Sequence, residues 1–162
     1  MPTNQWTNKI TLRKYSESDI PFMQTLYAST RESELAMTNF SAQEKLDFIH
    51  QQFTAQIAHY TQHYSTDAFN IIELDGNPIG RLFVDYWDSE IRIVDIALMP
   101  EHRNTGLGTY FFNQLFEQAK VDGKTVTIHV EHNNPARRLY ERLGFNLKTK
   151  TNEIYLLMEW SP

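Results

Sequence analysis

A short glycine-containing segment, residues 103–108 with the sequence RNTGLG, has the residue types and spacing of an anion-binding turn. It lies between an apolar run that predicts a strand and a periodic run that predicts a helix. The first N–H groups of a helix lack internal partners, and the helix dipole adds partial positive charge there. Gly106 and Gly108 let a ligand approach the backbone, Arg103 can donate a charge-assisted bond, and Asn104 tolerates left-handed backbone. The segment therefore predicts a phosphate-binding turn, with a plain strand-to-helix turn as the alternative if it is taken alone.

A second segment, residues 133–145 with the sequence NNPARRLYERLGF, follows another predicted strand. Asn134 and Pro135 predict the start of a short helix, as its N-cap and its first helical residue. Gly144 predicts the end of that helix. Both segments therefore place a helix directly after a strand of the predicted sheet.

Together, the two segments resemble the GNAT superfamily of N-acetyltransferases. Its first motif, Arg-x-x-Gly-x-Gly after a strand, matches residues 103–108. Its second motif, Asn-x-x-Ala-x-x-Leu-Tyr-x-x-Leu-Gly-Phe, matches residues 133–145. Both motifs are complete and stand in the family's order, and a motif in its expected context is a specific signal. The strong resemblance covers residues 70–147, whereas the N-terminal region matches only in the order of its elements.

The resemblance implies acetyl-CoA as the acyl donor and assigns residues to its binding. The backbone of Ala97, Leu98 and Met99 is expected to bind the pantetheine arm. Asn133 is expected to contact the cofactor, and Tyr140 to contact it near the thioester sulfur. The remaining cofactor contacts, most of them around the pyrophosphate, are Arg103, Asn104, Thr105, Gly106, Leu107, Gly108, Thr109 and Ala136.

The resemblance further implies that a neutral amine attacks the acetyl thioester directly. The chain has no cysteine, which excludes a cysteine-linked acyl-enzyme and favours a ternary complex. A backbone N–H at the Leu98 strand end is the candidate donor to the oxyanion, and Tyr140 the candidate proton donor to the leaving thiolate. The general base stays open among Asp95, Glu34 and a relayed water. Either carboxylate could instead serve only in an ion pair, and His129 is either a further base or a structural histidine.

The acceptor is expected to be the primary amine of a small molecule. Acetylation of a protein lysine or N-terminus is the alternative among enzymes, and a non-catalytic acyl-CoA sensor is the alternative outside them. The presence of Tyr140 and of a complete glycine loop favours an enzyme. Dimers are common among proteins that resemble this one, so a homodimer is a candidate assembly.

The elements that position these residues predict an α/β fold in a single domain, residues 1–162. Their order, β-α-α-β-β-β-α-β-α-β-β, indicates one mixed sheet with helices on its faces. The resemblance implies a mostly antiparallel, twisted sheet whose central strands splay apart around the cofactor. Ser41 and Glu44 predict a capping box before the second helix, and residues 75–78, DGNP, predict a hairpin turn. The polar residues 31–35 predict a loop between the first two helices.

The composition argues against several other classes of function. The net charge of −5 and the pI near 5.6 argue against nucleic acid as a partner, because phosphate backbones require a basic face. No apolar run approaches the ~18 residues of a membrane span, and residues 1–9 are polar, so a cytoplasmic protein without a membrane partner is expected. His59 and His63 lie four residues apart without evident further ligands, so no metal site is expected.

Overall fold

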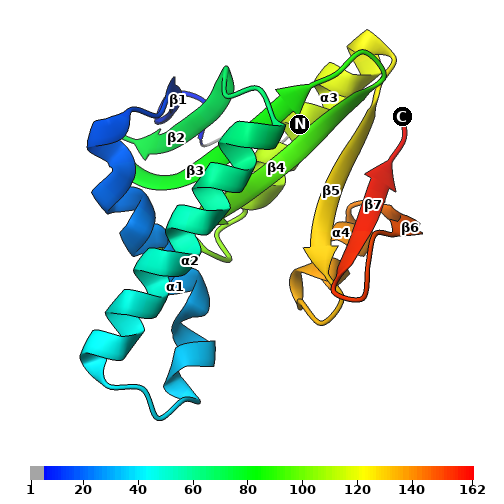
Figure 1. Ribbon diagram of the computed structural model, residues 1–162. Coiled ribbons are helices and arrows are strands. Elements are labelled where there is room, and N and C mark those ends of the chain that lie inside the picture. Colours follow the sequence, from blue (N-terminus) through cyan, green and yellow to red (C-terminus); the bar gives the residue numbers. More distant parts are fainter. Residues whose placement is uncertain (1–5) are drawn as a thin grey trace.

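The computed structural model describes residues 6–162, which form a seven-stranded sheet in the order β1-β2-β3-β4-β5-β7-β6 (Figure 1). Neighbouring strands are antiparallel except β4 and β5, which are parallel. The expected element order and the mixed, mostly antiparallel α/β sheet are therefore confirmed. The strands are β1 (Ile10–Lys14), β2 (Ala68–Leu74), β3 (Asn77–Tyr86), β4 (Glu90–Leu98), β5 (Thr125–Glu131), β6 (Asn146–Lys150) and β7 (Tyr155–Trp160). The helices are α1 (Ile20–Ala36), α2 (Ala42–His63), α3 (Leu107–Asp122) and α4 (Ala136–Arg142), with 3-10 turns η1 (Glu17–Asp19) and η2 (Pro100–His102).

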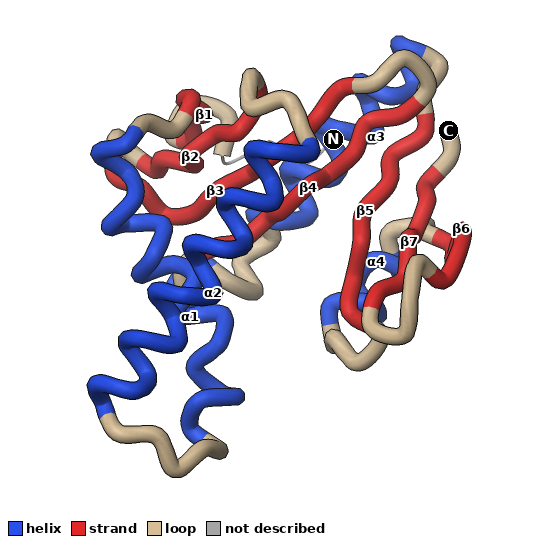
Figure 2. Tube along the Cα trace, viewed as in Figure 1, coloured by secondary structure: helices blue, strands red, loops and turns tan. Residues whose placement is uncertain are grey.

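Helices cover both faces of the sheet (Figure 1, Figure 2). On one face, α1 and α2 pack through a core that includes Met23, Phe53 and Phe83. On the other face, α3 and α4 pack through a core that includes Phe112 and Ile128. Each buried side chain of this size contributes roughly 1.5–3 kcal/mol relative to an exposed one. The two layers fix the ends of the strands, from which the predicted site residues come.

The capping box and the hairpin turn that the sequence predicts are both present in the structure. The Glu44 N–H donates to Ser41 Oγ at 3.1 Å, and the Ser41 N–H donates to the Glu44 carboxylate at 2.8 Å, which is the expected capping box. Asp75 and Gly76 have positive φ angles of 49° and 82°, as a two-residue hairpin between β2 and β3 requires. Both signals depend only on contacts between residues that are close in the sequence.

The expectation of a loop at residues 31–35 is wrong, because α1 continues through this segment. Arg31 donates to the Tyr27 hydroxyl at 2.6 Å and to the Glu34 carboxylate at 3.0 Å, so the polar side chains bond along the helix. Pairs at spacings of three and four residues stabilise a helix, and the buried Leu35 holds its last turn against the core. Glu34 therefore lies in the last turn of α1.

The two central strands separate, as the resemblance implied. Residues 90–93 of β4 pair with residues 125–128 of β5, and the recorded pairing ends there. Beyond this point β4 stays with β3 and β5 stays with β7, so the two halves of the sheet diverge (Figure 1). A bulge interrupts the β3–β4 register at Val94, so that Phe83 pairs with Asp95. Because a bulge redirects the side chains next to it, this irregularity aims Asp95 at the gap.

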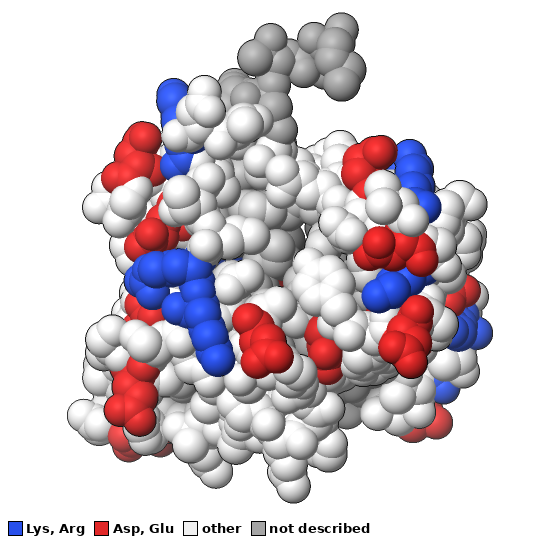
Figure 3. Space-filling model, turned by 90° about the horizontal axis from the view of Figure 1, so that it is seen from above, with Lys and Arg blue, Asp and Glu red and all other residues white. Residues whose placement is uncertain are grey.

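Charged side chains of both signs are spread over the surface. In the view from above, Lys and Arg are interspersed with Asp and Glu, and neither sign covers the face (Figure 3). No helix within residues 6–162 is long and apolar enough to cross a membrane. On this face no patch of one sign marks a binding site.

Candidate active-site cleft

A cleft with a volume of about 1020 Å³ lies where β4 and β5 separate. Helices α1 and α2 wall it on one side, and the ends of β4 and β5 with the start of β7 wall it on the other. Leu98, Met99, the glycine loop and Ala136 lie outside its lining, at the end of β4 and the start of α4. The predicted site residues that line the cleft are Glu34, Asp95, Ala97, Asn133 and Tyr140.

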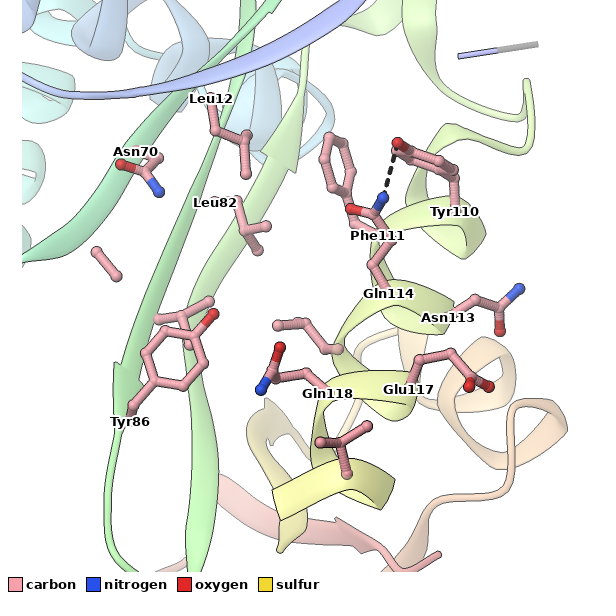
Figure 4. A pocket seen from close by; sticks show the side chains of 14 residues that line it. Leu12, Asn70, Leu82, Tyr86, Tyr110, Phe111, Asn113, Gln114, Glu117 and Gln118 are labelled. Atoms are coloured by element: carbon pink, nitrogen blue, oxygen red, sulfur yellow. Dashed lines mark hydrogen bonds between the residues drawn. The ribbon is translucent and has the colours of Figure 1, made fainter. Parts of the chain in front are cut away.

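A second hollow, of about 810 Å³, lies between α3 and the face of strands β1 to β3 (Figure 4). Leu12 and Leu82 form part of its apolar lining, and Gln114 donates to the Tyr110 hydroxyl at 2.8 Å along α3. Of its lining residues only Glu117 is charged. The hollow contains none of the predicted site residues, so the groups suited to acid–base chemistry gather in the cleft.

The glycine loop between β4 and α3 has the backbone expected of an anion-binding turn. Asn104 and Gly106 have positive φ angles of 59° and 87°. A Cβ atom added to Gly106 or Gly108 would meet no atom of the described chain within 4 Å beyond its immediate neighbours. Leu107 is fully buried and anchors the first turn of α3. The loop therefore leaves open space beside the N-terminus of α3, which suits a phosphate group.

Arg103 connects the glycine loop to two other elements. Its Nε donates to the Leu98 carbonyl oxygen at 2.9 Å, and its Nη2 donates to Ser29 Oγ of α1 at 2.9 Å. The Met99 N–H donates to the Ile79 carbonyl oxygen of β3 at 2.8 Å. These bonds fix the end of β4, while a contact of Arg103 with phosphate stays a prediction.

Gly80 of β3 has a role that the sequence analysis missed. It pairs with Leu98, and a Cβ atom at this position would lie 2.4 Å from the Ala97 carbonyl oxygen. Such a distance is a severe steric clash, so glycine allows β3 and β4 to approach closely at the strand end. The available signal was an isolated glycine within an apolar strand, which often marks a close backbone approach.

Tyr140 lies on α4 and packs between Phe112 and Phe145, whose ring centroids are 5.6 and 5.9 Å away. Burial, reinforced by the negative charge of Asp95, raises the pKa of its hydroxyl to about 12. The hydroxyl has no hydrogen-bond partner within residues 6–162. Tyr140 is therefore a protonated donor in the lining of the cleft.

Asp95 forms an ion pair with Arg81 of β3. Arg81 Nε donates to Asp95 Oδ2 at 2.6 Å, and Arg81 Nη2 donates to Gln56 Oε1 of α2 at 2.5 Å. The Arg81 side chain is 3% exposed and the Asp95 side chain is 24% exposed, so the carboxylate is the more accessible partner, although both residues line the cleft. Arg81 Nη1 is buried without a partner among the described residues. Neither Arg81 nor Gln56 was predicted from the sequence, although an arginine inside an apolar strand is a detectable sign of a buried pair.

Glu34 lies at the rim of the cleft. Its side chain is 63% exposed, and its carboxylate lies 2.9 Å from Arg31 Nη2. An exposed ion pair of this kind contributes about 0–1 kcal/mol. Both carboxylates that the sequence suggested as bases therefore line the cleft, and each is paired with an arginine.

His59 also lines the cleft, and its ring centroid lies 4.3 Å from that of His63. Residues 6–162 contain no group of three or more His, Cys, Asp or Glu side chains that could hold a metal ion. That no metal takes part in the chemistry stays a prediction.

Sequence comparison points to one family of proteins. The profile of the acetyltransferase (GNAT) family matches residues 26–145. An uncharacterized N-acetyltransferase of Methanocaldococcus jannaschii is 35% identical over 92 residues, which are 51% of this chain and 40% of that protein. A ribosomal protein bS18-alanine N-acetyltransferase of Haemophilus influenzae is 36% identical over 58 residues, which are 35% of this chain and 40% of that protein. The matches thus span about 40% of the length of these two relatives.

Comparison with solved structures points to the same family. The PaiA N-acetyltransferase from Thermoplasma acidophilum, crystallised in complex with coenzyme A, has a TM-score of 0.67 and 16% identity, covering 94% of this chain and 99% of that one. The ribosomal-protein-S18-alanine N-acetyltransferase from Escherichia coli has a TM-score of 0.56 and 20% identity, covering 94% of this chain and 93% of that one. These structures share the fold, and the family profile covers more than half of the sequence. The chain therefore belongs to the GNAT acetyltransferase family.

Proposed function

We propose that this chain is an acetyl-CoA-dependent N-acetyltransferase that acts on the primary amine of a small molecule. The observation that carries the proposal is the cleft between β4 and β5, which contains the protonated Tyr140 and adjoins the strand end that leads into the glycine loop. Membership of the GNAT family and the coenzyme A bound to the T. acidophilum protein support this choice of donor.

The residues present fit an acyl-CoA molecule. The open space at Gly106 and Gly108, with the unpaired N–H groups of the first turn of α3, suits the pyrophosphate. Beyond Ile93, β4 is paired with β3 alone, so its other edge offers backbone groups around Ala97 to an extended pantetheine arm. Asn133 lines the same cleft and is proposed as a further contact. Acetyl-CoA, when bound, supplies an activated acyl group.

The reaction places three demands on the chain. It must hold the amine against the acyl carbon, take a proton from the amine and give a proton to the leaving sulfur. Tyr140, with its raised pKa, is proposed to give that proton. Because the sequence has no cysteine to carry the acyl group, both substrates are proposed to occupy the cleft together.

Release of free thiol from acetyl-CoA tests the proposal. We expect turnover with at least one small primary amine in a panel of acceptors, and none with the tertiary amine of matched size, which cannot form an amide. Calorimetric titration should show that coenzyme A binds. Absence of binding at about 1 mM, equivalent to a free energy weaker than about −4 kcal/mol, would refute the proposal.

Acetylation of a protein N-terminus is the second candidate, because the H. influenzae relative is named as a ribosomal protein alanine N-acetyltransferase. The same assay separates the two, with peptides that begin with alanine and small amines offered at equal concentration. A higher kcat/KM for the peptides would favour a protein acceptor, and lysine-containing peptides with blocked N-termini test the side-chain alternative. Binding of coenzyme A without turnover of any acceptor would favour an acyl-CoA sensor.

A further inference from the structure

His129 occupies the first position of β5 beyond its pairing with β4. The last paired residues are Ile93 and Ile128, while the other edge of β5 continues to pair, with His129 opposite Leu157 of β7. Ile128 and Val130 belong to the core behind the sheet, so the alternation of the strand directs His129 to the opposite face. There it lines the cleft, at the point where the two central strands begin to separate.

Charged and titratable groups surround this position from several elements. Glu90 and Arg92 of β4 act directly on the charge of His129, and Arg92 also donates to the Tyr64 hydroxyl of α2. The same cleft is lined by Asp95 of β4, Glu131 of β5, Tyr140 of α4 and Tyr155 of β7. Burial, followed by the positive charge of Arg92, lowers the pKa of His129 below its usual value, and Glu90 opposes this shift. The imidazole is therefore neutral near pH 7 and has a lone pair that can accept a proton.

A hydrogen-bond network holds Arg92 in place beside the cleft. Arg92 Nε donates to Thr127 Oγ1 at 2.8 Å, and the Thr127 hydroxyl donates to the Glu90 carboxylate at 2.5 Å. The guanidinium lies 4.7 Å from the centre of the Trp87 ring. Because Arg92 and Thr127 are buried, the positive charge that acts on His129 has a fixed position.

The two cleft carboxylates that the sequence suggested as bases are already hydrogen-bonded. Asp95 accepts from Arg81 at 2.6 Å, and Glu34 accepts from Arg31 at 3.0 Å. In contrast, the His129 ring has no hydrogen-bond partner within residues 6–162. A general base needs a lone pair that is available to the substrate, and His129 meets this requirement without breaking an ion pair.

We propose that His129 is the general base that accepts the proton of the acceptor amine. This inference rests on the proposed function. As the amine nitrogen bonds to the acyl carbon, its proton passes to an imidazole nitrogen; the C–S bond breaks, and Tyr140 gives its proton to the thiolate. The imidazolium then loses its proton to water and the tyrosinate regains one, which restores both groups.

The substitution His129→Gln tests the inference, because glutamine is polar and of similar size but has no acid–base nitrogen. We expect kcat/KM to fall by on the order of 10²-fold or more, while the affinity for coenzyme A stays unchanged in calorimetry. The kcat/KM of the wild type should increase with pH, with an acidic limb centred below about pH 6.5, because activity requires the neutral form of the imidazole. The variant should lack this limb, and the control His63→Gln, outside the cleft lining, should keep it.

Two further measurements separate a base from a structural histidine. His129→Glu restores a proton acceptor, so it should recover part of the lost kcat/KM with the acidic limb moved toward about pH 4.3. An NMR titration of the wild-type imidazole should give a pKa below the ordinary value. The inference would be overturned if His129→Gln kept the wild-type kcat/KM and the wild-type acidic limb of the pH profile. It would also be overturned if His129→Glu recovered no activity, or if the imidazole pKa were raised. In each case the proposed function would still stand. Absence of acetyl-CoA turnover in the wild type would overturn both.

Discussion

At the scale of single residues, one physical cause shifts the pKa values of both the proposed acid, Tyr140, and the proposed base, His129. Burial disfavours the charged form of any group, so it raises the pKa of a tyrosine and lowers the pKa of a histidine. It is the leading cause of the shifts at Tyr140 and at His129. The same environment therefore keeps the proposed acid protonated and the proposed base neutral at pH 7.

Tyr140→Phe removes the proposed acid and keeps the aromatic ring that packs against Phe112 and Phe145. We expect kcat to fall by on the order of 10²-fold, because the lost interaction is made chiefly in the transition state. Affinity for coenzyme A should change little, and the loss should shrink with a thioester whose thiolate is a better leaving group. Steady-state kinetics on both proteins provide the measurement.

The control for this substitution is Tyr110→Phe, whose hydroxyl bonds to Gln114 away from the cleft. It should keep the wild-type kcat. Since the pKa of Tyr140 is about 12, the wild type should show no alkaline loss of kcat/KM from this group up to about pH 10, the ordinary pKa of tyrosine. A Tyr140→Phe enzyme with wild-type kcat would leave the residue with a packing role alone.

At the scale of elements, the site depends on how strands end and helices begin. The bulge at Val94 aims Asp95 into the cleft, and Gly80 lets β3 approach the end of β4. The glycine loop then starts α3 with open space beside its first turn. Irregular positions at the ends of β3 and β4, together with the glycine loop, thus shape the proposed donor site.

Gly108→Ala tests the open space in front of α3. Alanine suits a helix better than glycine by about 0.5–1 kcal/mol, and within residues 6–162 its Cβ would meet no atom within 4 Å beyond its chain neighbours and its own helix backbone, so the melting temperature of the free variant should not fall. The methyl group would lie where the pyrophosphate is proposed to bind, so we expect a Kd for coenzyme A at least tenfold higher, about 1.4 kcal/mol. Calorimetry measures the affinity, with Asn113→Ala on the same helix as the control. An unchanged Kd would place the pyrophosphate elsewhere.

The sequence predicted those elements whose signals are local. The Ser41–Glu44 capping box and the hairpin at Asp75 and Gly76 need only neighbouring residues, and the structure confirms both. The end of α1 was missed because residues 31–35 are polar, and their helical pairing and the burial of Leu35 depend on tertiary packing. Apart from this helix end, the fold was largely predictable, because the two sequence motifs and the order of the elements suffice to define it.

Less of the candidate site could be predicted, because the site depends on the register in which neighbouring strands pair. The sequence pointed to Asp95 and Tyr140, and the cleft brings them together. The pairing of Asp95 with Arg81 joins two strands, and no local pattern specifies which residue of β3 faces which residue of β4. The position of His129 likewise depends on where β4 and β5 stop pairing.

At the scale of the whole molecule, a ligand that binds only the folded protein must stabilise it. Binding adds about 2.7 kcal/mol at a ligand concentration of 100 Kd. At roughly 2–4 °C per kcal/mol for a chain of this size, we expect coenzyme A to raise the melting temperature by about 5–11 °C. Thermal unfolding with and without the ligand measures this change.

Pantetheine, which lacks the pyrophosphate, is the matched control and should give a smaller shift at the same concentration. The Gly108→Ala protein should also respond less to coenzyme A than the wild type. Equal shifts with pantetheine and coenzyme A would contradict a role of the glycine loop in phosphate binding.

The separation of β4 and β5 also creates two strand edges in the middle of a sheet. Exposed edges ordinarily invite pairing with another polypeptide and hence aggregation. Here α1 and α2 wall one side of the gap. A free strand edge that would otherwise invite pairing with another polypeptide is thus the backbone proposed to hold the extended pantetheine arm.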